Sequence, residues 1–326
     1  MKILAVDDNS ITLGLLKMLA ARAGFTDILT ATSGEIALSM INNGDVVYDC
    51  LLLDISMPAM NGIELCALVR AIPAYNKTPI IMLTAMTDKD NIDSAFIAGA
   101  TDYATKPFDV VELNARLRLA EAIVIDTKLH IKQDFKEKPQ SQSDNTFKQN
   151  TDLSEEFKIE GIDGLIGYDV FRNYIAQLSR AGLAGSQVIA VKIEQINTIH
   201  TKATTDEFLY ALTEVADAIS ETIKTNGYMM TYAGNGIFLV VSNKASMESS
   251  VKIETEIQNL LDERGTEYDN SDPLDIEIAI GNPIRPSFNK SQQIRKTFAR
   301  AIARAENRYL RRQNEPKLPN IRLVKK

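Results

Sequence analysis

The stretch DCLLLDISMPAMNG, residues 49–62, decides the fold of the first part of the chain. Its run at residues 49–53 is typical of a short strand that is buried on both faces of a sheet. This run ends at an acid, Asp54. A carboxylate directly after a buried strand lies at the carboxyl edge of the sheet, which is where sheets of parallel strands bind their ligands.

The same pattern continues on both sides of this stretch. Residues 2–6, KILAV, form another short apolar run, and Asn9 and Ser10 can cap the helix that follows it. Further strands are predicted near 27–31, 79–83 and 101–104, and further helices near 33–43, 63–70, 89–98 and 109–125. Five strands that alternate with five helices predict an α/β domain over residues 1–125, with a doubly wound (βα)5 parallel sheet.

Polar residues follow four of these strands at the point where each strand ends. Asp7 and Asp8 follow the first strand, Asp54 ends the third, Thr84 ends the fourth and Lys106 follows the fifth. Three carboxylates supply the oxygen ligands that Mg²⁺ prefers. Asp54 can then act as a nucleophile toward a phosphoryl group, and the metal, the ammonium and the hydroxyl can stabilise the charge that develops on it.

These residues lie in motifs that resemble the receiver domains of two-component response regulators, which have a flavodoxin-like fold. The matching motifs are Val6-Asp7-Asp8-Asn9, Asp54 to Gly62, Leu83-Thr84-Ala85, Gly99 to Tyr103, and Lys106-Pro107-Phe108. The resemblance implies a histidine kinase or phosphotransfer protein as the phosphoryl donor.

The resemblance also implies a role for each site residue. Asp54 is expected to be the phosphoacceptor, and Mg²⁺ is expected to bind Asp7, Asp8, Asp54 and the Ser56 backbone carbonyl. Lys106 is expected to bind the phosphate, with a cis peptide bond to Pro107. Thr84 and Tyr103 resemble the switch pair of the family. Phosphorylation is expected to bias an equilibrium between two receiver states. The face that carries Tyr103 is expected to respond to that change, often by forming a homodimer.

Residues 126–156 are expected to be a helical extension followed by a flexible polar linker. Residues 132–150 contain mainly Gln, Ser, Asn and Lys, and such a segment cannot bury enough apolar surface to fold. Before it, apolar residues recur in steps of four and three, which allows two interpretations: a short coiled-coil seam or one face of the last receiver helix. The residues concerned are Leu113, Leu117, Ala120, Val124, Thr127 and Ile131.

Residues 157–326 are predicted to form a second, α+β domain with a mainly antiparallel central sheet. Strands are predicted at 187–193, 228–232, 236–241 and 274–281, and helices at 168–181, 204–224 and 291–309. Ala233, Gly234 and Asn235 form a hairpin-type turn between two of the strands.

The second domain resembles the GGDEF family of diguanylate cyclases, which join two GTP molecules into cyclic di-GMP. Asp163 to Phe171 resembles the family's opening motif, and Asp206 to Leu209 resembles its G-D-E-x-L helix. Ile276 to Gly281 and Phe298 to Asn307 resemble its terminal strand and helix.

The residues that carry cyclase chemistry in that family differ here. The signature hairpin G-G-D/E-E-F is replaced by Ala233-Gly234-Asn235-Gly236-Ile237, so Asn235 and Gly236 stand where the family has acids. The metal-binding aspartate of the first strand aligns with Lys192, a cation that repels Mg²⁺.

The remaining cyclase positions are only partly kept. Glu194, two residues after Lys192 on the same strand face, can substitute for the metal-binding acid only if the alignment shifts. The guanine-binding Asn aligns with His200, while the family's Asp is kept as Asp206. The product-inhibition motif R-x-x-D falls on residues 224–227, where Lys224 and Gly227 replace its charged ends. We therefore predict an output domain that is not an enzyme.

Three functions stay open. The favoured one is a response regulator whose inactive output domain binds a downstream protein partner. The alternatives are an active diguanylate cyclase with unusual ligands and a sensor that binds GTP or cyclic di-GMP without turnover. A formal net charge of −7 argues against DNA or RNA binding by the whole chain, and we interpret the basic residues after Arg304 as a solvated helix end.

The composition also predicts the compartment. No apolar run approaches the roughly 20 residues that span a bilayer, and the N-terminus lacks the apolar region of a signal peptide. Cys50 and Cys66 both lie in apolar segments, which predicts buried, reduced thiols. With only His130 and His200 available, a histidine-based metal site or catalytic triad is not expected. We predict a cytoplasmic protein with no membrane contact.

Overall fold

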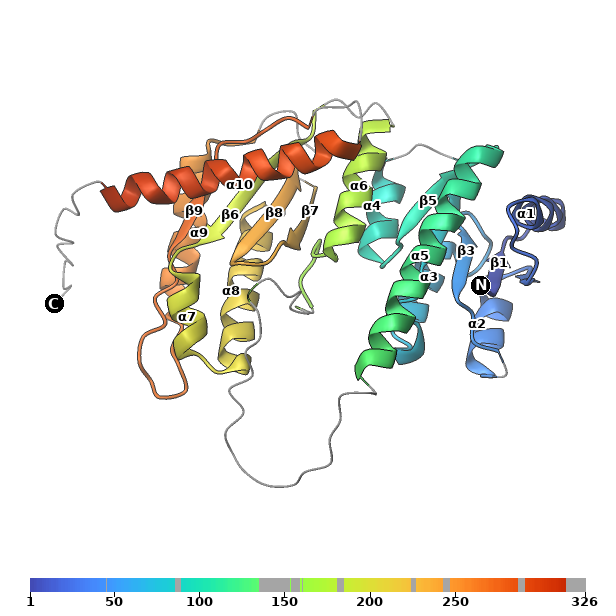
Figure 1. Cartoon of the computed structure of the whole chain (residues 1–326), viewed down its shortest axis with the longest axis horizontal. Coiled ribbons are helices and arrows are strands. Elements are labelled where there is room, and N and C mark those ends of the chain that lie inside the picture. Colours follow the sequence, from blue (N-terminus) through green and yellow to red (C-terminus); the bar gives the residue numbers. More distant parts are fainter. Residues whose placement is uncertain are drawn as a thin grey trace, which may run out of the picture. The chain divides into compact units, whose positions relative to one another are not determined.

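The computed structural model describes residues 1–44, 46–85, 89–134, 153, 159, 161–180, 185–223, 227–242, 247–286 and 291–314 (Figure 1). The chain divides into two compact units, Met1–Gln149 and Asn150–Lys326. Most of the polar segment predicted as a linker lies outside the described residues, and so does Lys224. No helix in the described part of the chain has the length and apolar character needed to cross a membrane.

The first unit contains a parallel sheet of five strands in the order β2-β1-β3-β4-β5. This order confirms the predicted doubly wound, flavodoxin-like fold. The three central strands are fully buried, which explains their continuous apolar runs. The strands are β1 (Ile3–Val6), β2 (Ile28–Ala31), β3 (Cys50–Asp54), β4 (Ile80–Thr84) and β5 (Asp102–Thr105).

Helices follow the strands of this sheet, and local sequence sets where they begin. The Asn9 side chain accepts hydrogen bonds from the first turn of α1, and Asn61 forms a capping box with Glu64 at the start of α3. Both cysteines are free and buried, as predicted. The elements are α1 (Ser10–Arg22), α2 (Gly34–Asn42), α3 (Gly62–Arg70), the 3-10 turn η1 (Pro73–Tyr75), α4 (Lys89–Ile97) and α5 (Val110–Asp134).

Helix α5 decides between the two interpretations of its apolar repeat. Leu113, Leu117 and Ala120 are buried in the core of the first unit, where they pack with residues of α1 and the sheet. These positions are therefore one face of the last receiver helix, and the coiled-coil interpretation is wrong for them. The helix continues past residue 125 to Asp134, as the predicted helical extension requires, and Lys128 forms an ion pair with Asp49 of the same unit.

The second unit contains an antiparallel sheet of four strands in the order β7-β8-β6-β9. This confirms the predicted antiparallel sheet. The last strand is shorter than predicted, because only Ile278–Ile280 pair in the sheet, although Leu274 and Ile276 are also buried in the core. The strands are β6 (Gln187–Ile193), β7 (Tyr228–Tyr232), β8 (Ile237–Ser242) and β9 (Ile278–Ile280).

Helices cover both faces of the second sheet. Helices α7, α8 and α9 share one apolar core with it, whereas α6 and α10 pack on the opposite face, where α10 crosses the strands (Figure 1). Two helices were missed by sequence reasoning: α7 is too short to show a helical period, and α9 offers few apolar positions among its charges. The helices are α6 (Tyr168–Arg180), α7 (Ile196–Lys202), α8 (Thr205–Ile223), α9 (Ser250–Arg264) and α10 (Ser291–Asn314).

Candidate functional site

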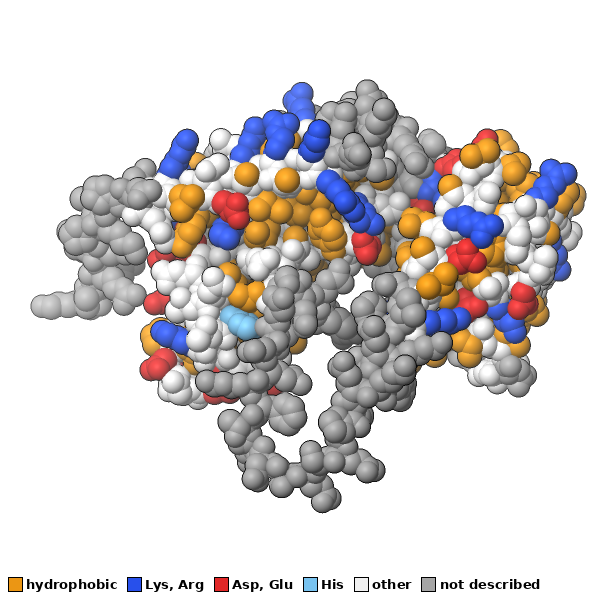
Figure 2. All heavy atoms as spheres, in the orientation of Figure 1, with side chains coloured by type: hydrophobic (Ala, Val, Ile, Leu, Met, Phe, Trp, Pro, Cys, Tyr) orange, Lys and Arg blue, Asp and Glu red, His pale blue; other side chains and the backbone are white. Residues whose placement is uncertain are grey.

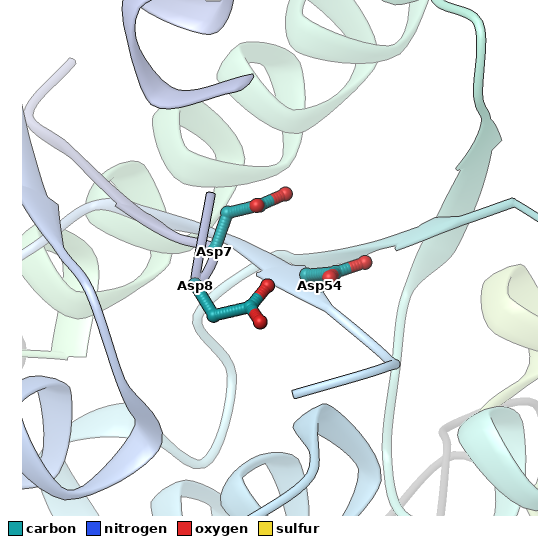
Figure 3. A group of neighbouring side chains, drawn as sticks. All are labelled: Asp7, Asp8 and Asp54. Atoms are coloured by element: carbon teal, nitrogen blue, oxygen red, sulfur yellow. The ribbon is translucent and has the colours of Figure 1, made fainter. Parts of the chain in front are cut away.

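Three carboxylates converge at the carboxyl edge of the parallel sheet. Asp7 and Asp8 follow β1, and Asp54 is the last residue of β3, the neighbouring strand. Oxygen atoms from all three lie within 4.8 Å of one another, and Figure 3 shows the side chains extending from adjacent strand ends. Asp7 and Asp54 are buried, whereas Asp8 is exposed. The site is therefore open to solvent on one side and anchored in the core on the other.

Lys106 lies between two of these acids. Its Nζ atom is 2.7 Å from Oδ2 of Asp7 and 2.8 Å from Oδ1 of Asp54. Burial lowers the pKa of Lys106, but its hydrogen bonds to Asp54 and Asp7 outweigh burial and raise the pKa overall. The ammonium is therefore held in its charged form, where it partly neutralises the acidic cluster.

For Asp54, burial outweighs the opposing hydrogen bonds, so the pKa of its carboxyl group is raised overall. Burial raises the pKa of this carboxyl group, while Lys106 and the Ser56 backbone amide oppose the shift by hydrogen bonding to the charged form. No described contact tests whether the Ser56 carbonyl can bind a metal, so that role stays a prediction.

Thr84 and Lys106 are brought to the same edge by strand pairing. Asp54 pairs with Leu83, the residue before Thr84, and Thr84 pairs with Thr105, the residue before Lys106. The Lys106 backbone amide donates a hydrogen bond of 2.7 Å to the Thr84 carbonyl, and the Lys106–Pro107 bond is cis. Residues far apart in the sequence thus meet where the strand-end pattern predicts.

Tyr103 is already turned into the protein in this structure. Its side chain is buried, packs edge-to-face against Phe96, and has the Arg116 guanidinium 5.7 Å from its ring centre. Arg116 forms buried ion pairs with Asp102 and Glu112. Sequence reasoning missed Arg116, because a lone arginine on a helix carries no signal until the fold shows which ring it covers.

Gly62 has a structural reason to lack a side chain. A Cβ atom at this position would lie 2.1 Å from the Asp54 carbonyl oxygen. Helix α3 therefore begins in direct backbone contact with the loop that follows the candidate phosphoacceptor.

Sequence comparison matches residues 3–118 to the family described as "Response regulator receiver domain". The chain is 38% identical to the chemotaxis protein CheY of Pseudomonas aeruginosa over 117 residues, which cover 36% of this chain and 93% of CheY. This chain belongs to the response regulator receiver family. The receiver domain forms its N-terminal part, and receiver domains generally bind Mg²⁺ and interact with histidine kinases or phosphotransfer proteins.

Two further relatives differ in how much of their own length the match covers. The transcriptional regulatory protein YvrH of Bacillus subtilis is 39% identical over 116 residues, but the match spans only 47% of its length and 36% of this chain. The crystal structure of the chemotaxis protein CheY4 of Vibrio cholerae is 32% identical, and the match covers 97% of that chain and 36% of this one with a TM-score of 0.35.

The donor set of the receiver site fits a hard divalent cation. Three carboxylates face one another, and within the described residues the Lys106 ammonium is the one cation paired with them, so the cluster keeps an excess of negative charge. Asp7, Asp8 and Asp54 would supply oxygen ligands, and a bound Mg²⁺ would neutralise charge on a phosphoryl group.

In the second unit, the hairpin turn between β7 and β8 leaves no room for a side chain at Gly236. Gly234, Asn235 and Gly236 all have positive φ angles, of 81°, 52° and 71°. A Cβ atom at Gly236 would approach Ile196 to 2.8 Å, and the Gly236 amide donates a hydrogen bond to the Tyr232 hydroxyl. An acid at this position would therefore require the hairpin to change its conformation.

Glu194 is not free to act as a metal ligand in this structure. It is 6% exposed, and its carboxylate lies 3.4 Å from Arg312 of α10. Arg312 also lies 3.6 Å from Glu254 and donates to the Ile278 carbonyl at 2.8 Å. Burial, together with Glu277 and Glu254, raises the pKa of Glu194 to about 7 even though Arg312 opposes the shift.

The other cyclase positions occupy separate structural settings. His200 packs edge-to-face against Phe208, with ring centres 4.9 Å apart. Asp206 is exposed in the first turn of α8, and Lys192 is half-buried on β6. Gly227 has a φ of 57° directly before β7. Within the described residues, the only cluster of three or more acids, histidines or cysteines able to hold a metal is the receiver cluster.

Proposed function

We propose that this protein is a response regulator phosphorylated on Asp54, whose C-terminal unit is a degenerate GGDEF-like output domain that acts by binding a protein partner. One observation carries the receiver half of the proposal: Lys106 bridges Asp7 and Asp54 beside the exposed Asp8. A histidine kinase or phosphotransfer protein is the donor that receivers take their phosphoryl group from.

The residues of the site divide the chemistry between them. The Asp54 carboxylate oxygen attacks phosphorus and displaces the donor's leaving group, which forms an acyl phosphate. The Lys106 ammonium then leaves Asp54 and pairs with a phosphoryl oxygen, and the Thr84 hydroxyl donates to another. The incoming group adds about two negative charges, which favours the receiver state that pairs those charges best.

Two observations support an output domain without cyclase activity. The hairpin glycine Gly236 has neither the space nor the φ angle for the acid that the family uses. Glu194, the one acid able to replace the metal ligand lost at Lys192, is buried and paired with Arg312. Among the residues of this unit that the structure describes, no cluster of three or more acids, histidines or cysteines could hold the metal of Mg²⁺-GTP.

Labelling with a small phosphodonor tests the receiver assignment. Wild-type protein with Mg²⁺ and acetyl phosphate is expected to gain one acid-stable, base-labile phosphoryl group by intact mass. Asp54→Asn is expected to gain none, whereas Asp109→Asn, which changes an exposed helix-start acid that is not part of the cluster, is expected to label like wild type. Persistent labelling of Asp54→Asn would exclude this phosphoacceptor.

The output assignment needs a separate measurement. Purified protein with Mg²⁺-GTP is expected to produce no cyclic di-GMP in the presence or absence of phosphodonor. Product formation would establish the cyclase alternative. Calorimetric titration with GTP and with cyclic di-GMP tests the sensor alternative, and saturable heats with either nucleotide would replace the protein-partner proposal.

A further inference from the structure

The second unit separates its charges between the two faces of its sheet. Helix α8, on one face, has five acids and no basic residue. Helix α10, on the opposite face, has seven basic residues and one acid, Glu306. Figure 2 shows the Lys and Arg side chains of α10 in a row along the helix. Such segregation is unlike a surface with interspersed charges, and it creates two surfaces of opposite potential on one domain.

The basic surface is a single flank of α10, which we define as Lys296, Arg300, Arg304, Arg308 and Arg311. Steps of four and three residues place these side chains on the same side of the helix. Lys296, Arg300 and Arg311 are exposed. Among the described residues, none of these three lies within ion-pair distance of an acid, whereas Arg308 pairs with Glu254 and Arg304 donates to backbone carbonyls.

The acidic surface is a stripe of α8, which we define as Asp206, Tyr210, Glu214, Asp217 and Glu221; all are exposed except Glu214, whose side chain is 19% exposed. The last three acids share one guanidinium, that of Arg264 in α9, so the stripe keeps a net negative charge. Asp217 and Glu221 remain 51% and 60% exposed. Tyr210 is 47% exposed and can serve as an aromatic anchor in an interface.

The two surfaces match in length as well as in charge. The stripe from Asp206 to Glu221 and the flank from Lys296 to Arg311 each cover fifteen residue steps of helix, or roughly 22 Å. Leu310, which is 50% exposed beside Arg311, gives the basic flank an apolar group of its own. Each molecule therefore carries both halves of a complementary pair, on faces that cannot meet within one unit because the sheet lies between them.

We propose that the basic flank of α10 binds the acidic stripe of α8 in a second copy of this chain. The contact is head-to-tail, because each copy uses two different surfaces, so association continues beyond the dimer unless the rotation closes a ring. Exposed ion pairs contribute little individually and are screened by salt. The association is therefore weak, reversible and strongly dependent on ionic strength.

Sedimentation of the full-length chain without phosphodonor tests this contact. The wild type is expected to self-associate at about 50 mM salt, with a dissociation constant that rises at least about tenfold at about 500 mM salt. Lys296→Glu/Arg300→Glu and Asp206→Lys/Glu221→Lys are each expected to be monomeric. A mixture of the two variants is expected to associate again, because each supplies the charge that the other's reversed surface needs.

A matched control separates this contact from a general charge effect. Arg295→Glu reverses an exposed cation on the other side of α10 and is expected to associate like wild type. Melting curves establish that every variant is folded. A wild type that stays monomeric at low salt, or variants that associate as wild type does, would overturn the proposal. A monomer whose basic flank instead binds single-stranded DNA would overturn it in favour of a nucleic-acid partner.

Discussion

The Nζ atom of Lys106 lies 2.8 Å from an Asp54 carboxylate oxygen. The cation that is proposed to bind the phosphoryl group is therefore paired, in this structure, with the carboxylate that is proposed to accept that group. The same Nζ atom lies 2.7 Å from Asp7. The unphosphorylated site is thus held together by a cation of the protein itself, and access of any other cation to the cluster competes with Lys106.

Lys106→Ala is expected to tighten Mg²⁺ binding by about tenfold, because one positive charge next to the metal ligands is removed. In the absence of Mg²⁺, the variant is expected to lose about 2 kcal/mol of unfolding free energy, since two buried carboxylates lose their partner. Calorimetric Mg²⁺ titration and urea unfolding measure the two effects. Lys128→Ala, which removes an exposed pair with Asp49, is the control and is expected to change neither by a comparable amount.

Gly62→Ala is expected to destabilise the receiver by at least about 2 kcal/mol, because the added methyl group would overlap the Asp54 backbone carbonyl. Gly14→Ala is the matched control. Gly14 lies inside α1 with no atom within 4 Å of an added Cβ, so this change is expected to stabilise the protein by about 0.5–1 kcal/mol. Equal effects of the two substitutions in denaturant unfolding would contradict the close contact at Gly62.

Gly236→Glu is expected neither to create cyclase activity nor to be tolerated structurally. The new side chain meets Ile196, and the φ angle of 71° is unfavourable for any residue with a Cβ atom. Gly265→Ala is the control, because Gly265 has a φ of 55° but open space around it. The difference in melting temperature between the two variants measures the steric part of the cost. A stable Gly236→Glu protein that makes cyclic di-GMP would show that the hairpin can be repaired by one substitution.

Because of Glu194, the unfolding free energy of the second unit is expected to fall as the pH rises through about 7. Burial raises the pKa of Glu194 to about 7 in the folded state, above its ordinary value of 4.5. The folded protein therefore binds the proton more tightly than the unfolded chain does, so the contribution is complete below about pH 4.5 and is lost as the pH passes 7. Its size is about 3 kcal/mol.

Calorimetric melting of the full chain between pH 5 and pH 8 checks this dependence. Glu194→Gln is expected to flatten the pH dependence of the second unit, because the neutral amide cannot titrate. Glu263→Gln, an exposed acid in α9, is expected to leave the dependence unchanged. A wild-type profile that becomes more stable with rising pH over this range would contradict the assignment.

The receiver site could be predicted from the sequence because its chemistry is tied to topology. Strand-end residues such as Asp54 and Thr84 meet wherever parallel strands pair in the flavodoxin-like order, so periodicity and position are enough to place them. Arg116 and Arg312 could not be predicted in the same way. Apart from Glu112, four residues before Arg116 on α5, their partners come from other elements whose packing has no local sequence signal, as the pairing of Arg312 with Glu194 across 118 positions illustrates.

In the second unit, the antiparallel sheet followed from alternating strands and a glycine-rich turn, but the charge cluster beneath α10 did not. Glu254 lies in the unpredicted helix α9, where a buried acid interrupts the apolar period. Its carboxylate accepts a hydrogen bond from the Ile280 amide and pairs with Arg308. Glu254, which the sequence suggests is exposed to solvent, is thus a buried residue that links α9 to the last strand and the last helix.

Helix α5 starts three residues after the cis bond of Lys106 and runs without a glycine or proline to Asp134. An α-helix of 25 residues is roughly 37 Å long, and an uninterrupted one has no joint at which a tilt can dissipate. A tilt of its first turn would therefore be carried along the whole helix, against the packing of Leu113 and Leu117 in the core and the ion pair between Lys128 and Asp49. The helix is thus one continuous rigid element that is anchored in the receiver core.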